Sequence, residues 1–370
     1  LVYSEVIEFI KEQDTIKGVK VLDHHTGIVT DYYAPVTVNA GGIWGHHIAQ
    51  MAGANISMFP AKGALLIFAH RVNSVVINRC RKPANADILV PGDTVCVIGT
   101  TSTRVPYEEC DHLKVTPDEV DLLLTEGAKL APCLAETRVL RAYAGVRPLV
   151  SADNDPSGRN ISRGIVCLDH ETRDGIKGFI SITGGKLMTY RLMGEMAADA
   201  VCKKLGRDAK CVTADTPLPG SEPGGIEEIS KKIWEVPTMV QKASVGRFGT
   251  QAANLDFDGD VKGSLVCECE EVSVSEVDSA IENLEVNNLV DLRRRTRFGM
   301  GTCQGELCAC RAAGRLAKAR KCTAKARTDL KDFMNERWKG MYPVAWGETL
   351  RESAYTQWVY SEVMGLGEEI

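Results

Sequence analysis

The strand-to-helix junction that decides the fold reads Thr183-Gly184-Gly185-Lys186-Leu187-Met188-Thr189-Tyr190-Arg191. The residues before it, 178–182, predict a strand, and residues 186–206 predict a helix with apolar positions at helical spacing. A glycine pair at a helix N-terminus leaves backbone N–H groups open to a ligand, and the helix dipole favours negative charge there. The alternative is an ordinary helix that begins at a glycine.

Alternating strands and helices surround this junction. We expect strands at residues 2–10, 18–23, 34–39, 64–68, 95–99, 136–144 and 165–169. A second glycine turn, Asn39-Ala40-Gly41-Gly42-Ile43-Trp44, opens a short helix that ends near Ala52. Thr116, Pro117 and two acidic residues mark the start of a helix over 117–130. The pattern predicts an α/β (α+β) fold.

The composition is that of an ordinary globular protein of two or three domains. The 370 residues are 44% hydrophobic and 25% charged, with a net charge of −5. This excludes disordered, collagen-like and coiled-coil chains, and no charge bias points to nucleic acid. No apolar run is long enough to span a membrane, and no signal peptide is visible. Thirteen cysteines, an odd number and mostly scattered, suit a reducing compartment with a metal site at any cluster.

The second half of the chain carries two close cysteine pairs. Cys267-Glu268-Cys269 ends an apolar strand, and Gly301-Thr302-Cys303-Gln304-Gly305-Glu306-Leu307-Cys308 follows after two predicted helices at 273–283 and 288–297. Four thiolates hold one [2Fe–2S] cluster, and close pairs reduce the entropy cost of assembling the site. Buried cysteines or structural zinc are the alternatives, and Cys310 is a substitute ligand.

Basic residues are dense around the second cysteine pair and face one acid, Glu306. They are Arg293, Arg294, Arg295, Arg297, Arg311, Arg315, Lys318, Arg320, Lys321, Lys325 and Arg327. Such a field stabilises an anionic cluster and raises its reduction potential. A solvated helix face is the alternative for residues 315–327.

Two arginines are candidates for binding an anionic substrate group. Arg147 stands before Pro148 at a predicted strand end, and Arg163 follows Ser157-Gly158-Arg159-Asn160. A guanidinium at such a position binds a phosphate or carboxylate with two hydrogen bonds. A surface ion pair is the alternative for each.

Two family resemblances rest on these motifs. Residues 264–315 resemble [2Fe–2S] domains of the bacterioferritin-associated-ferredoxin type, through both cysteine pairs and Asp291-Leu292-Arg293-Arg294-Arg295-Thr296. The whole chain resembles FAD-dependent glycerol-3-phosphate dehydrogenases. That resemblance rests on both glycine turns, Pro60-Ala61-Lys62-Gly63, Ile98-Gly99-Thr100-Thr101 and Ala144-Gly145-Val146-Arg147-Pro148-Leu149.

The resemblance implies roles for individual residues. Those implied to contact FAD are Ala40, Gly41, Trp44, Gly184, Gly185, Leu187 and Thr189. Lys186, Arg147 and Arg163 are implied to orient or hold glycerol 3-phosphate. The implied cluster ligands are Cys267, Cys269, Cys303 and Cys308.

The resemblance also implies a reaction and its setting. Hydride passes from glycerol 3-phosphate to FAD, giving dihydroxyacetone phosphate, and electrons then pass through the [2Fe–2S] cluster to other subunits and a quinone. The implied partners, a second flavin-type subunit plus an iron–sulfur membrane-anchor subunit, hold the chain on the inner face of the cell membrane. The alternatives are a flavin-dependent proline- or sarcosine-like dehydrogenase subunit, or else a non-catalytic electron-transfer subunit.

One departure from the family pattern concerns the N-terminus. The G-x-G-x-x-G unit that binds the FAD pyrophosphate does not occur, and the chain begins with Leu1 inside an expected strand. We therefore expect a fragment that is inactive in isolation and binds FAD poorly alone.

The expected domains follow from these features. They are the remainder of the FAD-binding domain (1–52), a substrate-binding mixed sheet (53–145), a return to the FAD domain with the flavin-facing helix (146–210), a linker with short helices (211–262), the [2Fe–2S] domain (263–315) and a helical tail (316–370). Aromatic residues concentrate between Tyr342 and Tyr360, which predicts either core packing or a docking surface for a partner.

Overall fold

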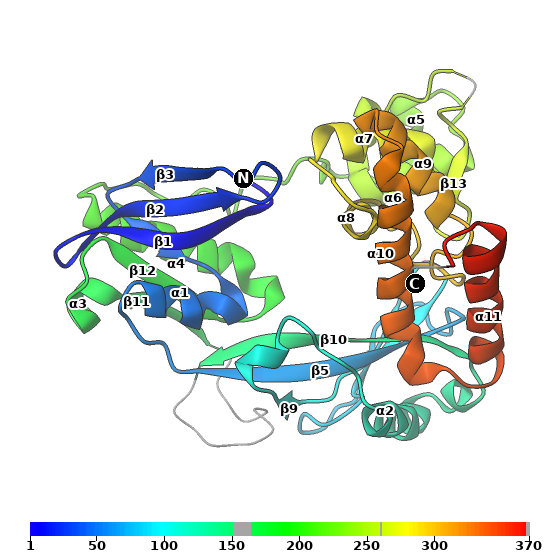
Figure 1. Cartoon of the computed structure of the whole chain (residues 1–370), viewed down its shortest axis with the longest axis horizontal. Helices are drawn as coiled ribbons and strands as arrows, with labels where there is room; N and C mark the ends of the chain where they lie inside the picture. Colours follow the sequence, from blue (N-terminus) through cyan, green and yellow to red (C-terminus); the bar gives the residue numbers. More distant parts are fainter. Residues whose placement is uncertain (151–163, 260, 368–370) are drawn as a thin grey trace. The chain divides into compact units, whose positions relative to one another are not determined.

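The computed structural model describes residues 1–150, 164–259 and 261–367 (Figure 1). The chain forms two compact units. The first comprises residues 1–63, 102–113 and 145–216, and the second comprises 64–101, 114–144 and 217–370. The chain passes from one unit to the other within the long strands β5 (Met58–Phe68) and β10 (Val139–Val150).

The first unit contains two small sheets. Strands β1 (Ser4–Glu12), β2 (Thr15–Asp23) and β3 (Val29–Tyr33) form an antiparallel sheet in that order. In the other sheet β12 (Phe179–Gly184) lies between β11 (Ile165–Asp169), antiparallel to it, and β4 (Thr37–Asn39), parallel to it. Helices α1 (Gly45–Met51) and α4 (Tyr190–Lys204) contact this second sheet. The short helix α3 (His170–Asp174) joins β11 to β12.

A mixed hydrophobic core joins the elements of the first unit. Strands β1 and β2, helix α1 and strand β12 all contribute buried side chains to it. They include Phe9, Ile16, Ala49, Ala52, Ile56 and Phe179. The rings of Phe9 and Phe179 meet edge to face at 5.2 Å, so this core ties β1 to β12.

The largest sheet has the order β10-β5-β8-β7-β6, and β9 (Thr103–Arg104) also pairs with β5. Its remaining strands are β6 (Ile77–Asn78), β7 (Ile88–Pro91) and β8 (Cys96–Gly99). The β7–β8 hairpin turns where Gly92 donates its N–H to the Val95 carbonyl at 2.8 Å. Helix α2 (Pro117–Leu130) packs on this sheet through Val120 and Leu123.

Helices dominate the rest of the second unit. They are α5 (Ile226–Ile233), α6 (Met239–Phe248), α7 (Val274–Asn283), α8 (Leu289–Thr296), α9 (Ala309–Arg320), α10 (Ala324–Met341) and α11 (Gly347–Trp358). A short hairpin of β13 (Leu265–Cys267) and β14 (Val272–Ser273) precedes α7. One core, which includes Val277, Leu292, Phe298, Leu316 and Phe333, joins this hairpin to α7, α8, α9 and α10.

Helix-capping signals place several helices where the sequence predicts them. Thr116 caps α2 and Ser273 caps α7, each in a reciprocal capping box with the acid three residues later. The C-terminal tail is helical, as expected, but Trp338, Trp346, Tyr355 and Trp358 are about half exposed rather than in the core. Among the described residues no helix is both long and apolar enough to cross a membrane.

Two expectations about the first unit were wrong. The sequence did not predict β3, whose five residues are all exposed and show no alternation of burial. The helix after the glycine pair begins at Tyr190 rather than Lys186, because a 3₁₀ turn at Leu187–Thr189 comes first. The glycine pair therefore ends a strand and is separated from the helix proper.

Replacing the cap of α2 tests how that helix is stabilised. The Thr116 hydroxyl accepts a hydrogen bond from the Glu119 backbone N–H at 3.3 Å. We expect Thr116→Ala to lower the free energy of unfolding by about 1 kcal/mol, because one N–H at the helix start loses its acceptor. Denaturant unfolding measures this. Thr116→Ser is the control and should retain most of the stability; equal stability of the alanine variant would contradict the role of the cap.

Candidate functional site

The fold brings the two cysteine pairs together within the second unit. Cys267 ends β13, and Cys308 immediately precedes α9; both are about 1% exposed. Cys269 follows in the β13–β14 turn, and its Sγ lies 3.7 Å from the Sγ of Cys303. Cysteine side chains from two distant segments of the sequence thus lie close together, as the spacing of the two cysteine pairs predicts.

Glycines let the second segment wrap closely around the first. A Cβ on Gly301 would lie 2.3 Å from the Cβ of Cys269, and one on Gly305 would lie 2.6 Å from the ring of Phe333. Gly305 also has φ of +94°, which favours glycine. The loop from 299 to 305 therefore approaches the sulfurs only because these positions carry no side chain.

Hydrogen bonds lower the pKa of two of the four cysteine sulfurs. The bond with the Cys308 thiol lowers the pKa of Cys267 to about 7 against the effect of burial, and the N–H groups of Gly299 and Glu270 add to it. Bonds with Cys269 and Cys308 lower the pKa of Cys303 further. The Cys269 and Cys308 thiols donate in these pairs, so their own pKa values are raised. N–H groups aimed at sulfur are also the contacts that tune a bound cluster.

The donor set fits a cluster with two metal positions. In the part of the chain that the structure describes, no three His, Cys, Asp or Glu side chains converge on one point that a single ion could occupy. A [2Fe–2S] cluster needs two thiolates at each iron, not three at one point. Cys310, the substitute ligand, lies in the first turn of α9 and packs against the hydrophobic core.

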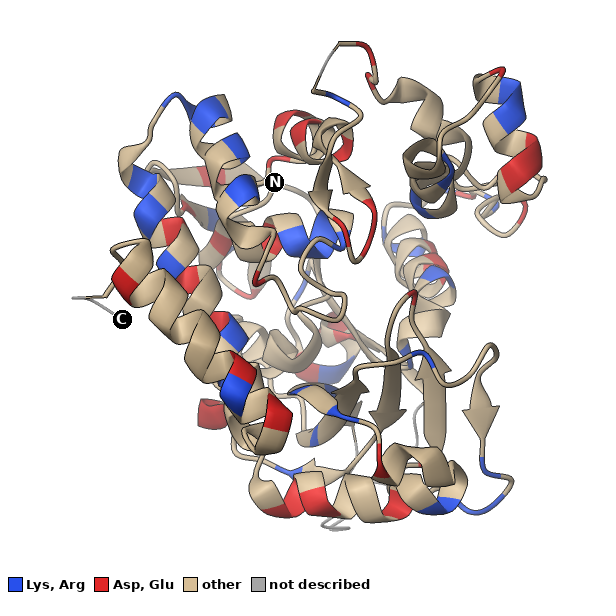
Figure 2. Cartoon of the chain, turned by 90° about the vertical axis from the view of Figure 1, so that its right-hand side faces the viewer, with Lys and Arg blue, Asp and Glu red and all other residues tan. Residues whose placement is uncertain are grey.

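Five of the eleven basic residues around the cluster form ion pairs with carboxylates other than Glu306, which corrects the expectation of one facing acid. Arg311 binds Glu268 at 2.6 Å, Arg320 binds Asp329 at 2.6 Å, and Arg297 binds Glu270 at 2.8 Å. Arg315 is held by Asp278 through its Nε at 2.9 Å. Figure 2 shows basic and acidic residues interspersed along the helices. These four carboxylates lie outside the basic stretch of residues 293–327. The number of basic residues in that stretch therefore overstated the positive charge around the cluster.

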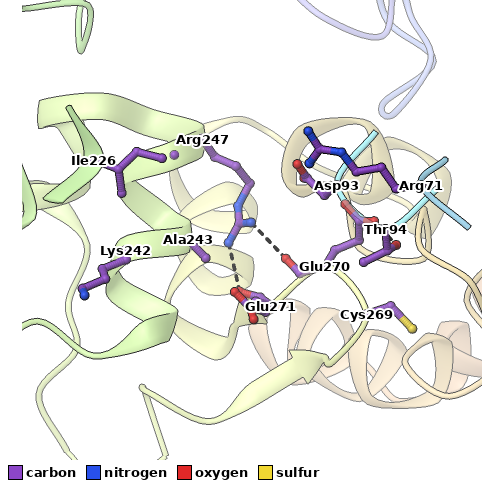
Figure 3. Close-up of a pocket in the computed structure, with 11 residues that line it drawn as sticks. Arg71, Asp93, Thr94, Ile226, Lys242, Ala243, Arg247, Cys269, Glu270 and Glu271 are labelled. Carbon is purple, nitrogen blue, oxygen red and sulfur yellow. Dashed lines mark hydrogen bonds between the residues drawn. The ribbon is translucent and has the colours of Figure 1, made fainter. Parts of the chain in front are cut away.

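A pocket opens beside Cys269 (Figure 3). Its volume is about 370 Å³, and Arg71, Asp93, Thr94, Lys242 and Arg247 are among the residues that line it. The guanidinium of Arg247 donates to the backbone carbonyls of Glu270 and Glu271 at 2.9 Å each.

Arg247 fixes the turn that carries Cys269. Besides the two carbonyls, it binds the fully buried carboxylate of Glu276 through Nε at 2.7 Å and Nη2 at 2.9 Å. Glu276 is also the partner of Ser273 in the capping box of α7. Sequence reasoning missed Arg247, because it lies before the cysteine segment in a helix without any motif.

The first unit holds the glycine turn of residues 40–45 through one buried amide. Asn39, 4% exposed, donates to the Gly45 carbonyl at 2.8 Å and to Ser181 at 3.1 Å, and accepts from the Gly41 N–H at 3.1 Å. Behind it, Ser181 bonds His170 at 2.8 Å, and His170 contacts Asp174 at 2.5 Å. The sequence offered no signal for this buried chain of contacts.

A cavity of about 310 Å³ joins the two glycine turns. Ala40 and Gly184, both implied to contact FAD, line it together with Gly42, Pro148, Ile182, Thr183, Tyr190 and Met193. Thr183 Oγ1 is buried and has no hydrogen-bond partner among the described residues. A largely apolar cavity between two glycine turns fits a flat aromatic ligand.

The other implied FAD contacts lie around this cavity without lining it. Leu187 is 91% exposed, and Trp44 is half exposed with its indole N–H donated to Asp111 at 2.9 Å. The N–H of Gly185 donates to the Gly164 carbonyl at 3.1 Å, and that of Lys186 donates to Thr189 Oγ1 at 2.9 Å. The expectation of open N–H groups at these two positions was therefore wrong.

Of the two candidate substrate-binding arginines, the structure describes only Arg147. Arg147 is half-buried, and its Nη1 donates to the Ala61 carbonyl at 3.4 Å. A Cβ on Gly63 would lie 2.5 Å from Arg147 Nη2, so the guanidinium lies directly on the β5 backbone. Lys186 is exposed, and Arg163 lies outside the described residues.

The two regions match two protein families. Residues 1–191 match the FAD dependent oxidoreductase family, and residues 265–316 match the BFD-like [2Fe-2S] binding domain. These matches define the class: an FAD-dependent oxidoreductase that carries a [2Fe–2S] domain.

Curated relatives narrow this class. The chain is 58% identical to the A subunit of the anaerobic glycerol-3-phosphate dehydrogenase of Escherichia coli (strain K12), over 100% of this chain and 68% of that protein. It is 57% identical to the corresponding protein of Haemophilus influenzae, over 99% of this chain and 65% of that protein. The chain belongs to this family of anaerobic glycerol-3-phosphate dehydrogenase subunits. It spans about two thirds of the length of these relatives.

A solved structure supports the fold. The glycerol-3-phosphate dehydrogenase from Bacillus halodurans, complexed with FAD, aligns with a TM-score of 0.73 over 94% of this chain and 71% of that chain. The sequence identity is 22%, so this likeness concerns the fold alone.

The close contact at Gly301 generates a test of the cluster site. We expect Gly301→Ala to lose at least half of the bound iron, because the new methyl group would push the loop away from Cys269. Iron and sulfide analysis of the purified chain measures this. Gly314→Ala in α9 is the matched control, since its Cβ meets open space. Full iron content in Gly301→Ala would contradict the geometry.

Proposed function

We propose that the chain works in the catalytic subunit of a quinone-linked dehydrogenase that oxidises sn-glycerol 3-phosphate to dihydroxyacetone phosphate. The observation that carries this proposal is identity of 57–58% along nearly the whole chain with proteins named as subunits of anaerobic glycerol-3-phosphate dehydrogenase. The cavity between the glycine turns and the four gathered sulfurs support it. When bound, FAD accepts two electrons as hydride and a [2Fe–2S] cluster carries one at a time, so together they join hydride chemistry to an electron chain.

Four cysteines are the proposed ligands of the cluster. They are Cys267, Cys269, Cys303 and Cys308. The support is their convergence, the N–H groups that face their sulfurs and the glycines that allow the approach. The chain's part is to hold these four sulfurs close together in a mostly dry setting, which would keep a cluster in place.

Arg147 is the proposed partner of the substrate phosphate. The Ala61 carbonyl and the Gly63 backbone fix its guanidinium, so little side-chain entropy is lost when it binds an anion. Lys186, exposed in the turn after the glycine pair, is proposed to orient the substrate, and Arg163 is proposed as a second phosphate partner. Ala40, Gly41, Trp44, Gly184, Gly185, Leu187 and Thr189 are the proposed FAD contacts.

Other subunits are proposed to receive the electrons and to hold the chain at the inner face of the cell membrane. The relatives are themselves named as one lettered subunit, which fits a protein with several subunits. The half-exposed aromatic residues Trp338, Trp346, Tyr355 and Trp358 are suited to such a docking surface.

Metal analysis with single cysteine variants tests the ligand set. We expect the anaerobically purified chain to hold about two irons and two sulfides, as one [2Fe–2S] cluster requires. Each Cys→Ser change at the four positions should remove most of the iron and the visible absorption. Cys310→Ser is the control and should retain both. Zinc without colour in the wild-type chain, or loss of iron only in the Cys310 variant, would contradict the assignment.

Steady-state kinetics of the complete enzyme test Arg147. We expect Arg147→Ala to lower kcat/KM for glycerol 3-phosphate by ten- to a hundredfold, roughly the 1.5–3 kcal/mol of a charged hydrogen bond. Glycerol, which lacks the phosphate, is the matched substrate, and its slow oxidation should change little. An equal loss with both substrates would show that Arg147 serves the fold rather than the phosphate.

A further inference from the structure

Three arginines in the second unit are buried or half-buried, with incomplete pairing. Arg337 of α10 is 4% exposed and Arg141 of β10 is 6% exposed, while Arg293 of α8 is half-buried. Within the described ranges, Arg337 Nε and Nη2 and Arg293 Nε have no hydrogen-bond partner. A buried guanidinium with unused donors is costly unless a negative charge compensates it.

Arg293 and Arg337 approach the loop that carries Cys303 and Cys308, and Arg141 packs beside them on α10. Arg293 Nη2 lies 3.4 Å from the Gln304 side-chain oxygen, and Arg337 Nη2 lies 3.9 Å from the Glu306 carboxylate. Arg141 lies across α10 at Gly340, where a Cβ would be 2.4 Å from its Nε. Arg141 also experiences the positive charges of Arg293 and Arg337, so the three form one group.

The acids near this group do not balance it. Arg141 Nη2 donates to the backbone carbonyl of Glu336 at 3.0 Å, but its distance to the Glu336 carboxylate is 3.7 Å. Glu306 is too far from Arg337 for a hydrogen bond, and Glu352 forms its ion pair with Arg138. Burial lowers the pKa of Arg141 to about 9 and also lowers the pKa values of Arg293 and Arg337. Within the described part of the chain, Arg141, Arg293 and Arg337 therefore lack the close carboxylate that the paired arginines of the cluster domain have.

We propose that Arg141, Arg293 and Arg337 are the counter-charges of the cluster and raise its reduction potential. This inference rests on the proposed [2Fe–2S] site at the four cysteines. A cluster held by four thiolates is anionic and gains one more negative charge on reduction, so buried positive charge favours the reduced form. Arg141 and Arg337 lie outside residues 265–316, so the potential of the cluster domain depends on the strand and the helix that flank it.

Potentiometric titration of the reconstituted chain, followed by electron paramagnetic resonance, tests this proposal. We expect Arg337→Met to lower the equilibrium constant for reduction about tenfold, which is about 59 mV for a one-electron couple. Arg337→Lys keeps the charge and should restore most of the potential. A merely structural arginine would change the iron content or stability but not the potential of the cluster that assembles.

Two further variants sharpen the test. Arg294→Met removes the same charge from an exposed position on α8, so screening should make its shift less than half as large. Glu306→Gln removes a negative charge beside Arg337 and should raise the potential. If Arg337→Met fails to fold, Glu306→Gln decides the question.

The outcomes separate the two proposals. A wild-type chain without iron and sulfide overturns the cluster and this inference with it. A wild-type cluster whose potential is the same in Arg337→Met, or unchanged or lowered in Glu306→Gln, leaves the proposed function intact and overturns the inference. Equal shifts in Arg337→Met and Arg294→Met also overturn it, because burial would then confer no advantage.

Discussion

The second unit depends on holding four sulfurs close together inside a protein core. Thiolates at this distance repel one another, and burial raises the cost of each charge. Hydrogen bonds offset this cost. The sulfurs of Cys267 and Cys303 accept them from the backbone N–H groups of Gly299, Glu270, Gly305 and Leu307. Those N–H groups are in place only because the loop carries glycines at the points of closest approach. The helices around the loop hold this backbone rather than supply ligands.

The effect of positive charge near the cluster depends more on how deeply each arginine is buried than on how many arginines there are. A row of arginines in sequence suggests a strong positive field, yet Arg297, Arg311, Arg315 and Arg320 are each matched by a carboxylate. An exposed, paired charge contributes little at a distance because solvent screens it. Arg337 and Arg141 are 4% and 6% exposed, so solvent screens their charges less than it screens the exposed pairs. The positive field near the cluster therefore depends on which arginines are paired and buried, and the sequence alone does not show this.

The sequence predicted best where local chemistry decides the structure. Thr116 and Ser273 marked helix starts correctly, since a capping box is complete within four residues. The cysteine pairs were found because ligand chemistry restricts their spacing. Strand β3 was missed because both its faces are exposed, so its residues show no alternation. Helix α4 starts later than predicted because Thr189 satisfies the N–H of Lys186 and a 3₁₀ turn forms first. Arg247 was missed because its partners lie more than twenty residues away in sequence.

The first unit shows a different way to build a site. A glycine turn that must admit a large ligand has no side chains of its own with which to anchor itself. Asn39 fixes it from behind by binding Gly41 and Gly45 at once. The amide is itself oriented by Ser181, and Ser181 is held by the fully buried His170 with Asp174 behind it. The rigidity of the turn therefore comes from residues that touch no ligand. Buried polar networks of this kind specify one arrangement because any unpaired member would be costly. By the same logic Thr183, on the strand that carries Ser181, is the weak point of this arrangement, because its buried hydroxyl has no partner among the described residues.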